Sequence, residues 1–123
     1  MVHTDSNEFK QKLSQVYNDV SKELFGFGTS LLKTSVHPEG IALYARHRRS
    51  PRSTALEGEV PALKYEVDFY MSMIYKKKLK SRLEDELGLQ IEVLLRDYDP
   101  ATQWAVTNII LKGSSKSPLL ITK

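Results

Sequence analysis

The most chemically distinctive stretch of the sequence is a cluster of basic side chains between residues 46 and 52. It contains Arg46, His47, Arg48, Arg49 and Arg52. A guanidinium group is planar and always charged, and it matches a phosphate or carboxylate through two parallel hydrogen bonds. Tyr44 precedes the cluster and, by strand alternation, points to the same face as Arg46. These six residues are candidates for binding an anionic ligand, a nucleic acid or an acidic partner; the alternative is an ordinary solvated loop.

Other patterns of catalytic or metal-binding residues are missing from the sequence. His3, His37 and His47 have none of the spacings that zinc sites use. There is no cysteine, no Gly-x-Ser-x-Gly elbow and no phosphate-cradling P-loop. We therefore expect no catalytic residue, no metal and no cofactor, and a protein that is not an enzyme.

Length and composition indicate a small globular protein. The chain has 123 residues, 41% of them hydrophobic and 27% charged, with a net charge of +3. This size corresponds to one domain, spanning residues 1–123. No apolar run is long enough for a membrane span, none at the start is typical of a signal peptide, and cysteine is absent. We therefore expect a cytoplasmic protein with no membrane partner.

Hydrophobic periodicity predicts two helices and two hairpins that would position these side chains. Apolar residues recur at helical spacing over residues 5–25 and 61–87. Period-two alternation predicts strands at 31–36 and 41–46 around a turn at 37–40, and strands at 89–96 and 103–111 around a turn at 97–100. Residues 47–60 show neither period and are predicted to be a long basic loop, and residues 113–123 a loose tail.

These elements predict a two-layer α+β domain in the order helix–hairpin–helix–hairpin. Its sheet would be four-stranded and mainly antiparallel, with two helices packed on one face. The similar order of both halves suggests duplication of a helix-plus-hairpin unit. On the outer face of this sheet, unbroken alternation would place Lys33, Tyr44, Arg46 and Arg96, a polar platform of the kind that binds RNA.

The second predicted helix has apolar residues on more than one side. Leu63, Val67, Tyr70 and Ile74 share one side. A second series drifts around the helix by about 40° at each step of four residues. It consists of Met71, Tyr75, Leu79, Leu83 and Leu87. A straight helix cannot bury both series on one sheet, so we expect either a bend near residues 76–78 or packing of the later half against something else, such as the first helix or another subunit. Candidates for contact with a second copy of the chain are Met71, Tyr75, Leu79 and Leu83.

Two short motifs resemble the YbcI-type family of small bacterial proteins. They are the helix exit Phe25-Gly26-Phe27-Gly28 and the segment from Leu83 through Gly88 into the strand ending at Asp97. The resemblance extends from about residue 9 to residue 111, although the basic stretch 46–60 is longer here than in that family. The resemblance implies a small cytoplasmic α+β protein and implies no particular activity.

Three functional hypotheses follow from these patterns. The leading one is a non-enzymatic interaction or regulatory module that forms a homodimer. The second is binding of a nucleic acid or an anionic ligand through the arginines of residues 46–52. The third is a small enzyme whose site forms between subunits.

Overall fold

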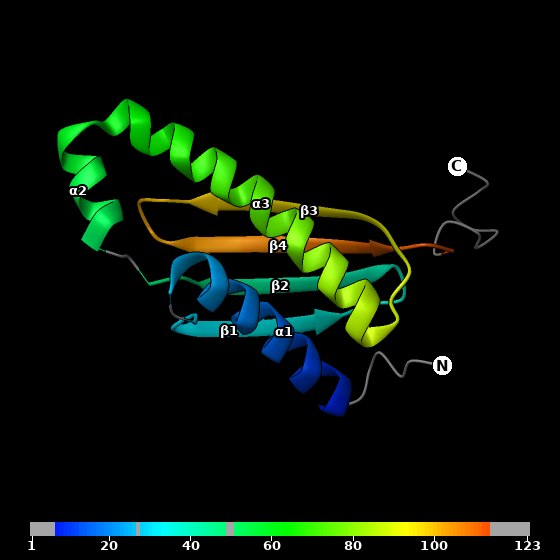
Figure 1. Cartoon of the computed structure of the whole chain (residues 1–123). Coiled ribbons are helices and arrows are strands. Elements are labelled where there is room, and N and C mark those ends of the chain that lie inside the picture. Colours follow the sequence, from blue (N-terminus) through cyan, green and yellow to red (C-terminus); the bar gives the residue numbers. More distant parts are fainter. Residues whose placement is uncertain (1–6, 27, 49–50, 114–123) are drawn as a thin grey trace.

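The structure, a computed structural model, describes residues 7–26, 28–48 and 51–113. These residues form helices and strands in the order α1 (Asn7–Phe25), β1 (Leu31–Val36), β2 (Gly40–Arg46), α2 (Pro51–Glu59), α3 (Pro61–Leu87), β3 (Ile91–Asp99) and β4 (Trp104–Leu111). The strands make one antiparallel sheet in the order β1-β2-β4-β3. Helices α1 and α3 lie over the same face of the sheet (Figure 1). The prediction of an α+β fold with a four-stranded antiparallel sheet is confirmed.

The predicted long loop is the main departure from the expected order of elements. Within residues 47–60, the chain forms helix α2 from residue 51 to residue 59, so the described part has three helices and not two. Pro51 begins the helix, at a position where its missing N–H costs nothing. Leu56 is the only large apolar residue of α2. The helix therefore lacks the apolar period by which the other two helices are recognised.

The second hairpin also differs from its prediction. Strand β3 continues through Asp99, so the expected turn at residues 97–100 lies later, at residues 100–103. The Asp99 carboxylate accepts hydrogen bonds from the Thr102 amide and hydroxyl, at 3.1 and 2.5 Å. The predicted tail falls outside the described residues beyond Gly113, as does Asp5 at the expected start of the first helix.

Two glycines occupy positions where the backbone geometry favours glycine. A side chain at Gly40 would meet the backbone oxygen of Ile109 at 2.0 Å, so only glycine lets β2 approach β4 here. Gly88 has a φ of 68° and donates its N–H to the Leu83 carbonyl, which ends α3. A left-handed residue in this position is the usual helix stop, and the observed end at Leu87 agrees with the predicted helix over residues 61–87.

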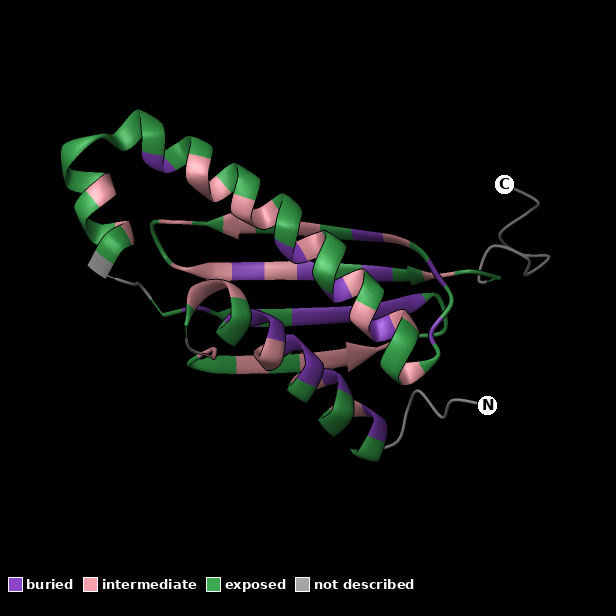
Figure 2. Cartoon of the chain, in the orientation of Figure 1, coloured by how far each residue is buried: buried purple, intermediate pink, exposed green. Residues whose placement is uncertain are grey.

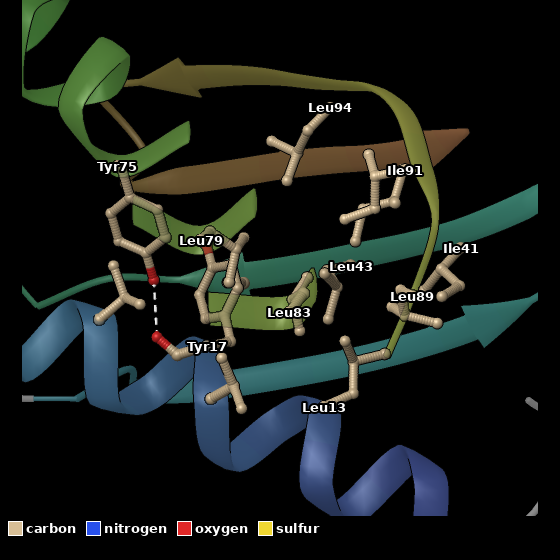
Figure 3. Close-up of a cluster of buried hydrophobic side chains, with 14 of the residues drawn as sticks. Leu13, Tyr17, Ile41, Leu43, Tyr75, Leu79, Leu83, Leu89, Ile91 and Leu94 are labelled. Atoms are coloured by element: carbon tan, nitrogen blue, oxygen red, sulfur yellow. Dashed lines mark hydrogen bonds between the residues drawn. The ribbon is translucent and has the colours of Figure 1, made fainter. Parts of the chain in front are cut away.

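The core lies between the sheet and the two long helices (Figure 3). Helix α1 contributes Phe9, Leu13, Val16 and Val20 from the apolar residues at helical spacing, together with Tyr17, and Leu24 of the same series packs against the edge of the core. The later half of α3 contributes Tyr75, Leu79 and Leu83, which are fully buried within one chain. These three side chains were expected at an interface with a second copy. Helix α1 and the sheet already cover them, so of the two expected neighbours it is the first helix, and not a second copy, that packs on this half of α3.

One side of helix α3 is buried along its second half, whereas much of its first half is exposed (Figure 2). The first half reaches past the end of the sheet together with α2 (Figure 1). The two apolar series predicted for this helix therefore lie on one continuous helix and face different surroundings. The later series meets the core, and the earlier series faces solvent.

Candidate functional site

A cluster of polar and aromatic side chains is buried beside the core, where α1 and α3 cross the end of β2. Its members come from four elements. They are Tyr17 and Ser21 of α1, His47 just after β2, Ser72 and Tyr75 of α3, and Arg96 of β3. Burial of so many polar groups is costly unless each is hydrogen-bonded, so their partners define what the cluster can do.

The hydroxyl of Tyr75 links the two helices. It donates to the Tyr17 carbonyl at 2.8 Å (Figure 3) and lies 2.6 Å from the Ser21 hydroxyl. Because a phenol has one proton, the Ser21 hydroxyl must be the donor to Tyr75. Burial, with a further contribution from Tyr17, raises the pKa of Tyr75 well above its ordinary value. Tyr75 is therefore a neutral structural link.

His47 is held as a neutral imidazole. Its Nε2 lies 2.9 Å from the Tyr17 hydroxyl and 3.0 Å from Nη2 of Arg96. A guanidinium can only donate, so Nε2 accepts and the ring proton is on Nδ1. Burial, and secondly the charge of Arg96, lowers the pKa of His47 to about 3. With its lone pair occupied, this imidazole is neither an acid nor a base at neutral pH.

Arg96 carries the charge of the cluster without a carboxylate partner in the described part of the chain. Its Nη1 donates to the Ser72 hydroxyl at 2.8 Å, and its Nη2 donates to His47. The guanidinium lies over the Tyr75 ring, 4.1 Å from the centroid. Its Nε is buried and has no hydrogen-bond partner. The guanidinium is therefore not fully satisfied by the described side chains around it.

A small cavity lies beside this guanidinium, between the start of α3 and the ends of β2 and β3. Its volume is about 50 Å³, several times the roughly 10–15 Å³ that one water molecule requires. Its lining includes the cations Arg48, Lys64 and Arg96 and a single carboxylate, Asp68. Lys64 is buried and forms an ion pair with Asp68. The lining therefore has an excess of positive charge.

A wider groove of about 300 Å³ runs between α3 and the end of β3, and Arg96 lines it as well. Tyr65, Phe69 and Met73 of α3 supply its apolar wall, and Tyr98 lines both the groove and the cavity. The guanidinium therefore lies where a polar cavity meets an apolar groove. This arrangement suits a molecule with an anionic group at one end and an apolar body.

The predicted basic cluster is divided between two faces of the sheet. Tyr44 and Arg46 are exposed on the face away from the helices, whereas His47 is buried on the opposite face. Arg48 lines the cavity. Arg52 is exposed on α2, and Arg49 lies outside the described residues. The cluster is thus not one continuous basic surface, because alternation along β2 turns successive side chains to opposite sides.

Arg96 is the main functional candidate that the sequence did not place correctly. Unbroken alternation put it on the outer face beside Lys33 and Tyr44. The pairing of β3 with β4 shifts between Ile91 and Val93, which is a β-bulge. The extra residue reverses the alternation, so Leu94 is buried and Arg96 faces the helices. The predicted outer platform therefore lacks Arg96.

Met71, the fourth interface candidate, is half-buried and lines the cavity. Lys64 and Ser72, which also line it, carry no sequence motif. Helical periodicity does group Lys64, Asp68, Met71 and Ser72 on neighbouring positions of α3. This shared side of the helix was the one sequence pattern that could have indicated the α3 wall of the cavity.

Within the described ranges, no group of three or more histidine, aspartate or glutamate side chains is placed to hold a metal ion. In the same residues, no helix combines the length and hydrophobicity needed to cross a bilayer. Comparisons of the chain with family models, curated proteins and solved structures found no match. Membership of the YbcI-type family therefore remains a prediction from short motifs.

Proposed function

We propose that this chain is a non-enzymatic module that binds a small molecule through an anionic group held by Arg96. The single observation that carries the proposal is the guanidinium itself, half-buried beside a cavity, with an unpartnered Nε and no hydrogen bond or ion pair to a carboxylate among the described residues. A buried charge without a counterion is unfavourable, and an anion in the cavity would relieve that cost.

The charges around the cavity favour an anion over a neutral ligand. Arg48 and Arg96 are not neutralised by the lining carboxylate, since Asp68 is paired with Lys64. Inside a partly enclosed site such an excess acts more strongly than on the surface, because the local dielectric constant is lower. A carboxylate suits the space better than a bulky polyphosphate, since the cavity holds only a few atoms.

The rest of the ligand would lie in the groove along α3. Tyr65, Phe69 and Met73 are exposed there and provide apolar contacts. The preferred ligand class is therefore an aromatic or aliphatic carboxylate. Binding sites that combine a mostly apolar wall with a few placed polar groups are typical of small-molecule pockets.

Binding without chemistry is favoured by the state of the titratable groups. The pKa of His47 is lowered to about 3 and its Nε2 accepts from Arg96, so the ring stays neutral and takes up no further proton at neutral pH. The pKa of Tyr75 is raised by burial, so its hydroxyl stays protonated. Neither group can serve as a general acid or base near neutral pH.

The test uses benzoate as the probe and benzamide as its neutral analogue. We expect benzoate to shift the Arg96 Nε–H resonance saturably in NMR titrations, and benzamide not to do so. The Arg96→Gln variant should bind benzoate at least about tenfold more weakly, since a charge-assisted hydrogen bond contributes about 1.5–3 kcal/mol. The Arg96→Lys variant keeps the charge and should show an intermediate loss.

Arg46→Gln is the matched control, because it removes an exposed arginine from the outer face of the same sheet. It should bind benzoate as the unchanged protein does, with circular dichroism confirming that all variants are folded. Two results would overturn the proposal. One is the absence of saturable binding by benzoate or inorganic phosphate; the other is equal loss of binding in the Arg46 and Arg96 variants.

A further inference from the structure

We infer that the exposed first half of α3 pairs with the same segment of a second copy of the chain, antiparallel, around a two-fold axis. The surface concerned is the outer stripe, defined as Leu63, Val67, Tyr70 and Ile74. At 100° per residue it lies on the side of α3 opposite the buried residues Tyr75, Leu79 and Leu83, and none of its residues lines the cavity at Arg96. The inference does not depend on the proposed ligand.

The outer stripe has the spacing of a two-helix seam. Its residues are separated by four, three and four positions, which is the alternation of core positions in a coiled coil. In ordinary surface helices the solvent side is polar. Here the core-facing side of α3 is supplied by other residues, so the outer stripe is a second apolar surface on the same helix.

The exposed area suits a weak pair of chains. About half of the surface remains accessible at the large exposed residues of the outer stripe: Leu63 (46%), Tyr70 (56%) and Ile74 (43%). At roughly 200 Å² for a fully exposed large side chain, these present on the order of 300 Å² per chain. Two copies therefore bury about 600 Å² of apolar side chain, which is less than the roughly 1,000 Å² of a stable specific interface, so we expect a weak dimer.

The charges beside the outer stripe select an antiparallel pair. The midpoint of the stripe lies between Asp68 and Phe69. Glu59, the last residue of α2, lies at the corner where the chain enters α3, and Glu66 lies on α3 before the midpoint, whereas Lys77 lies on α3 after it. In an antiparallel pair the acidic end of each helix meets the basic end of the other, whereas a parallel pair opposes like charges.

These charges are also free to pair between chains. Glu59, Glu66 and Lys77 form no ion pair with any other residue in the described ranges. A two-fold interface is self-complementary, so each pairing is made twice. The structure therefore combines a seam, an exposed apolar area suited to a weak dimer and a charge arrangement that all fit one occupant, the same chain.

The first experiment compares two tyrosines of α3 by analytical ultracentrifugation. The full chain should show a monomer–dimer equilibrium. Tyr70→Glu places a charge in the seam and should weaken dimerisation at least about thirtyfold, as expected for a central aromatic contact. Tyr65→Glu is the matched control: Tyr65 is more exposed, at 74%, but faces the opposite side of the helix, and its variant should dimerise normally.

A charge exchange tests the orientation. Lys77→Glu should weaken the dimer at low salt, and adding Glu59→Lys should restore it by re-forming the pair with reversed signs. Spin labels give an independent distance, because the chain has no cysteine. A label at Ser81→Cys would lie roughly 35–40 Å from its copy in an antiparallel pair, against about 10 Å between parallel helix axes.

Each outcome decides the inference. A monomer at all concentrations overturns it, and so does a dimer that survives Tyr70→Glu or is lost in Tyr65→Glu. A short distance between the Ser81 labels would retain the surface but reject the antiparallel arrangement stated here. Benzoate binding by the Tyr70→Glu variant is expected to be unchanged, so failure of the dimer and failure of the ligand site are distinguishable.

Discussion

Replacing His47 with glutamine should remove a pH dependence that burial of this imidazole imposes on stability. Burial, reinforced by the guanidinium of Arg96, lowers the pKa of His47 from 6.5 to about 3. In the unfolded chain the imidazole returns to its ordinary pKa of about 6.5. Between these values the unfolded chain binds one more proton than the folded chain, so the free energy of unfolding decreases as the pH falls.

The size of the effect follows from the two pKa values. The contribution of His47 to the free energy of unfolding has its full value above about pH 6.5. It then decreases by about 1.4 kcal/mol per pH unit as the pH falls towards 3. Between pH 7 and pH 5 this amounts to about 2 kcal/mol. Glutamine can still accept hydrogen bonds from Tyr17 and Arg96 through its amide oxygen, but it does not titrate. The variant should therefore lack this part of the pH dependence.

Urea denaturation of both proteins at several pH values between 5 and 7 measures the difference. Contributions from carboxylates are common to both chains and cancel in the comparison. His37→Gln is the control, since this exposed histidine lies at the turn between β1 and β2, and that variant should follow the unchanged protein. Parallel stability curves for the unchanged protein and His47→Gln would refute the reasoning, as would an NMR titration midpoint of His47 near 6.5.

Two further substitutions test the packing around the site and the sheet. Tyr75→Phe should lower the free energy of unfolding by about 1–3 kcal/mol, because it leaves the Ser21 hydroxyl and the Tyr17 carbonyl without their buried partner. Adding Ser21→Ala should recover part of that loss, and full additivity in this double-mutant cycle would contradict the hydrogen bond. Gly40→Ala should cost roughly 3 kcal/mol or more in chemical denaturation, because its methyl group would overlap a backbone oxygen of β4. Gly58→Ala, in open space on α2, should instead raise stability by up to about 1 kcal/mol, and equal effects at the two glycines would argue against the close approach of β2 and β4.

The elements with strong periodicity were predictable, and the site residue that depends on an irregular pairing was not. The range of α3, residues 61–87, follows from its apolar series, its initial proline and its final glycine. The direction of Arg96 depends on the bulge after Ile91, which is set by how β3 pairs with β4. Because one extra residue reverses every later side chain, a sequence reading with unbroken alternation assigns Arg96 to the wrong face.

His47 shows a different limit of the sequence reading. Alternation along β2 from Ile41 through Leu43 and Ala45 continues to the next inward position, which is His47. The alternation therefore indicated that the His47 side chain is buried. The residue was nevertheless grouped with its basic neighbours, because charge clustering was weighted above the period of the preceding strand. Its partners Tyr17 and Arg96 come from distant elements, so no local pattern indicated the hydrogen bonds.

The assignment of the two apolar series of α3 to core and solvent follows from chain connectivity. A helix of 27 residues is about 40 Å long, whereas a strand of nine residues such as β3 spans roughly 30 Å. One end of α3 must therefore extend past the sheet. Only residues 88–90 connect α3 to β3, which holds the later half over the sheet, while the longer connection through α2 leaves the earlier half free. The later series, with Tyr75 and Leu83, is thereby committed to the core. A surface for a second copy must consequently use the earlier series, which includes Leu63 and Tyr70.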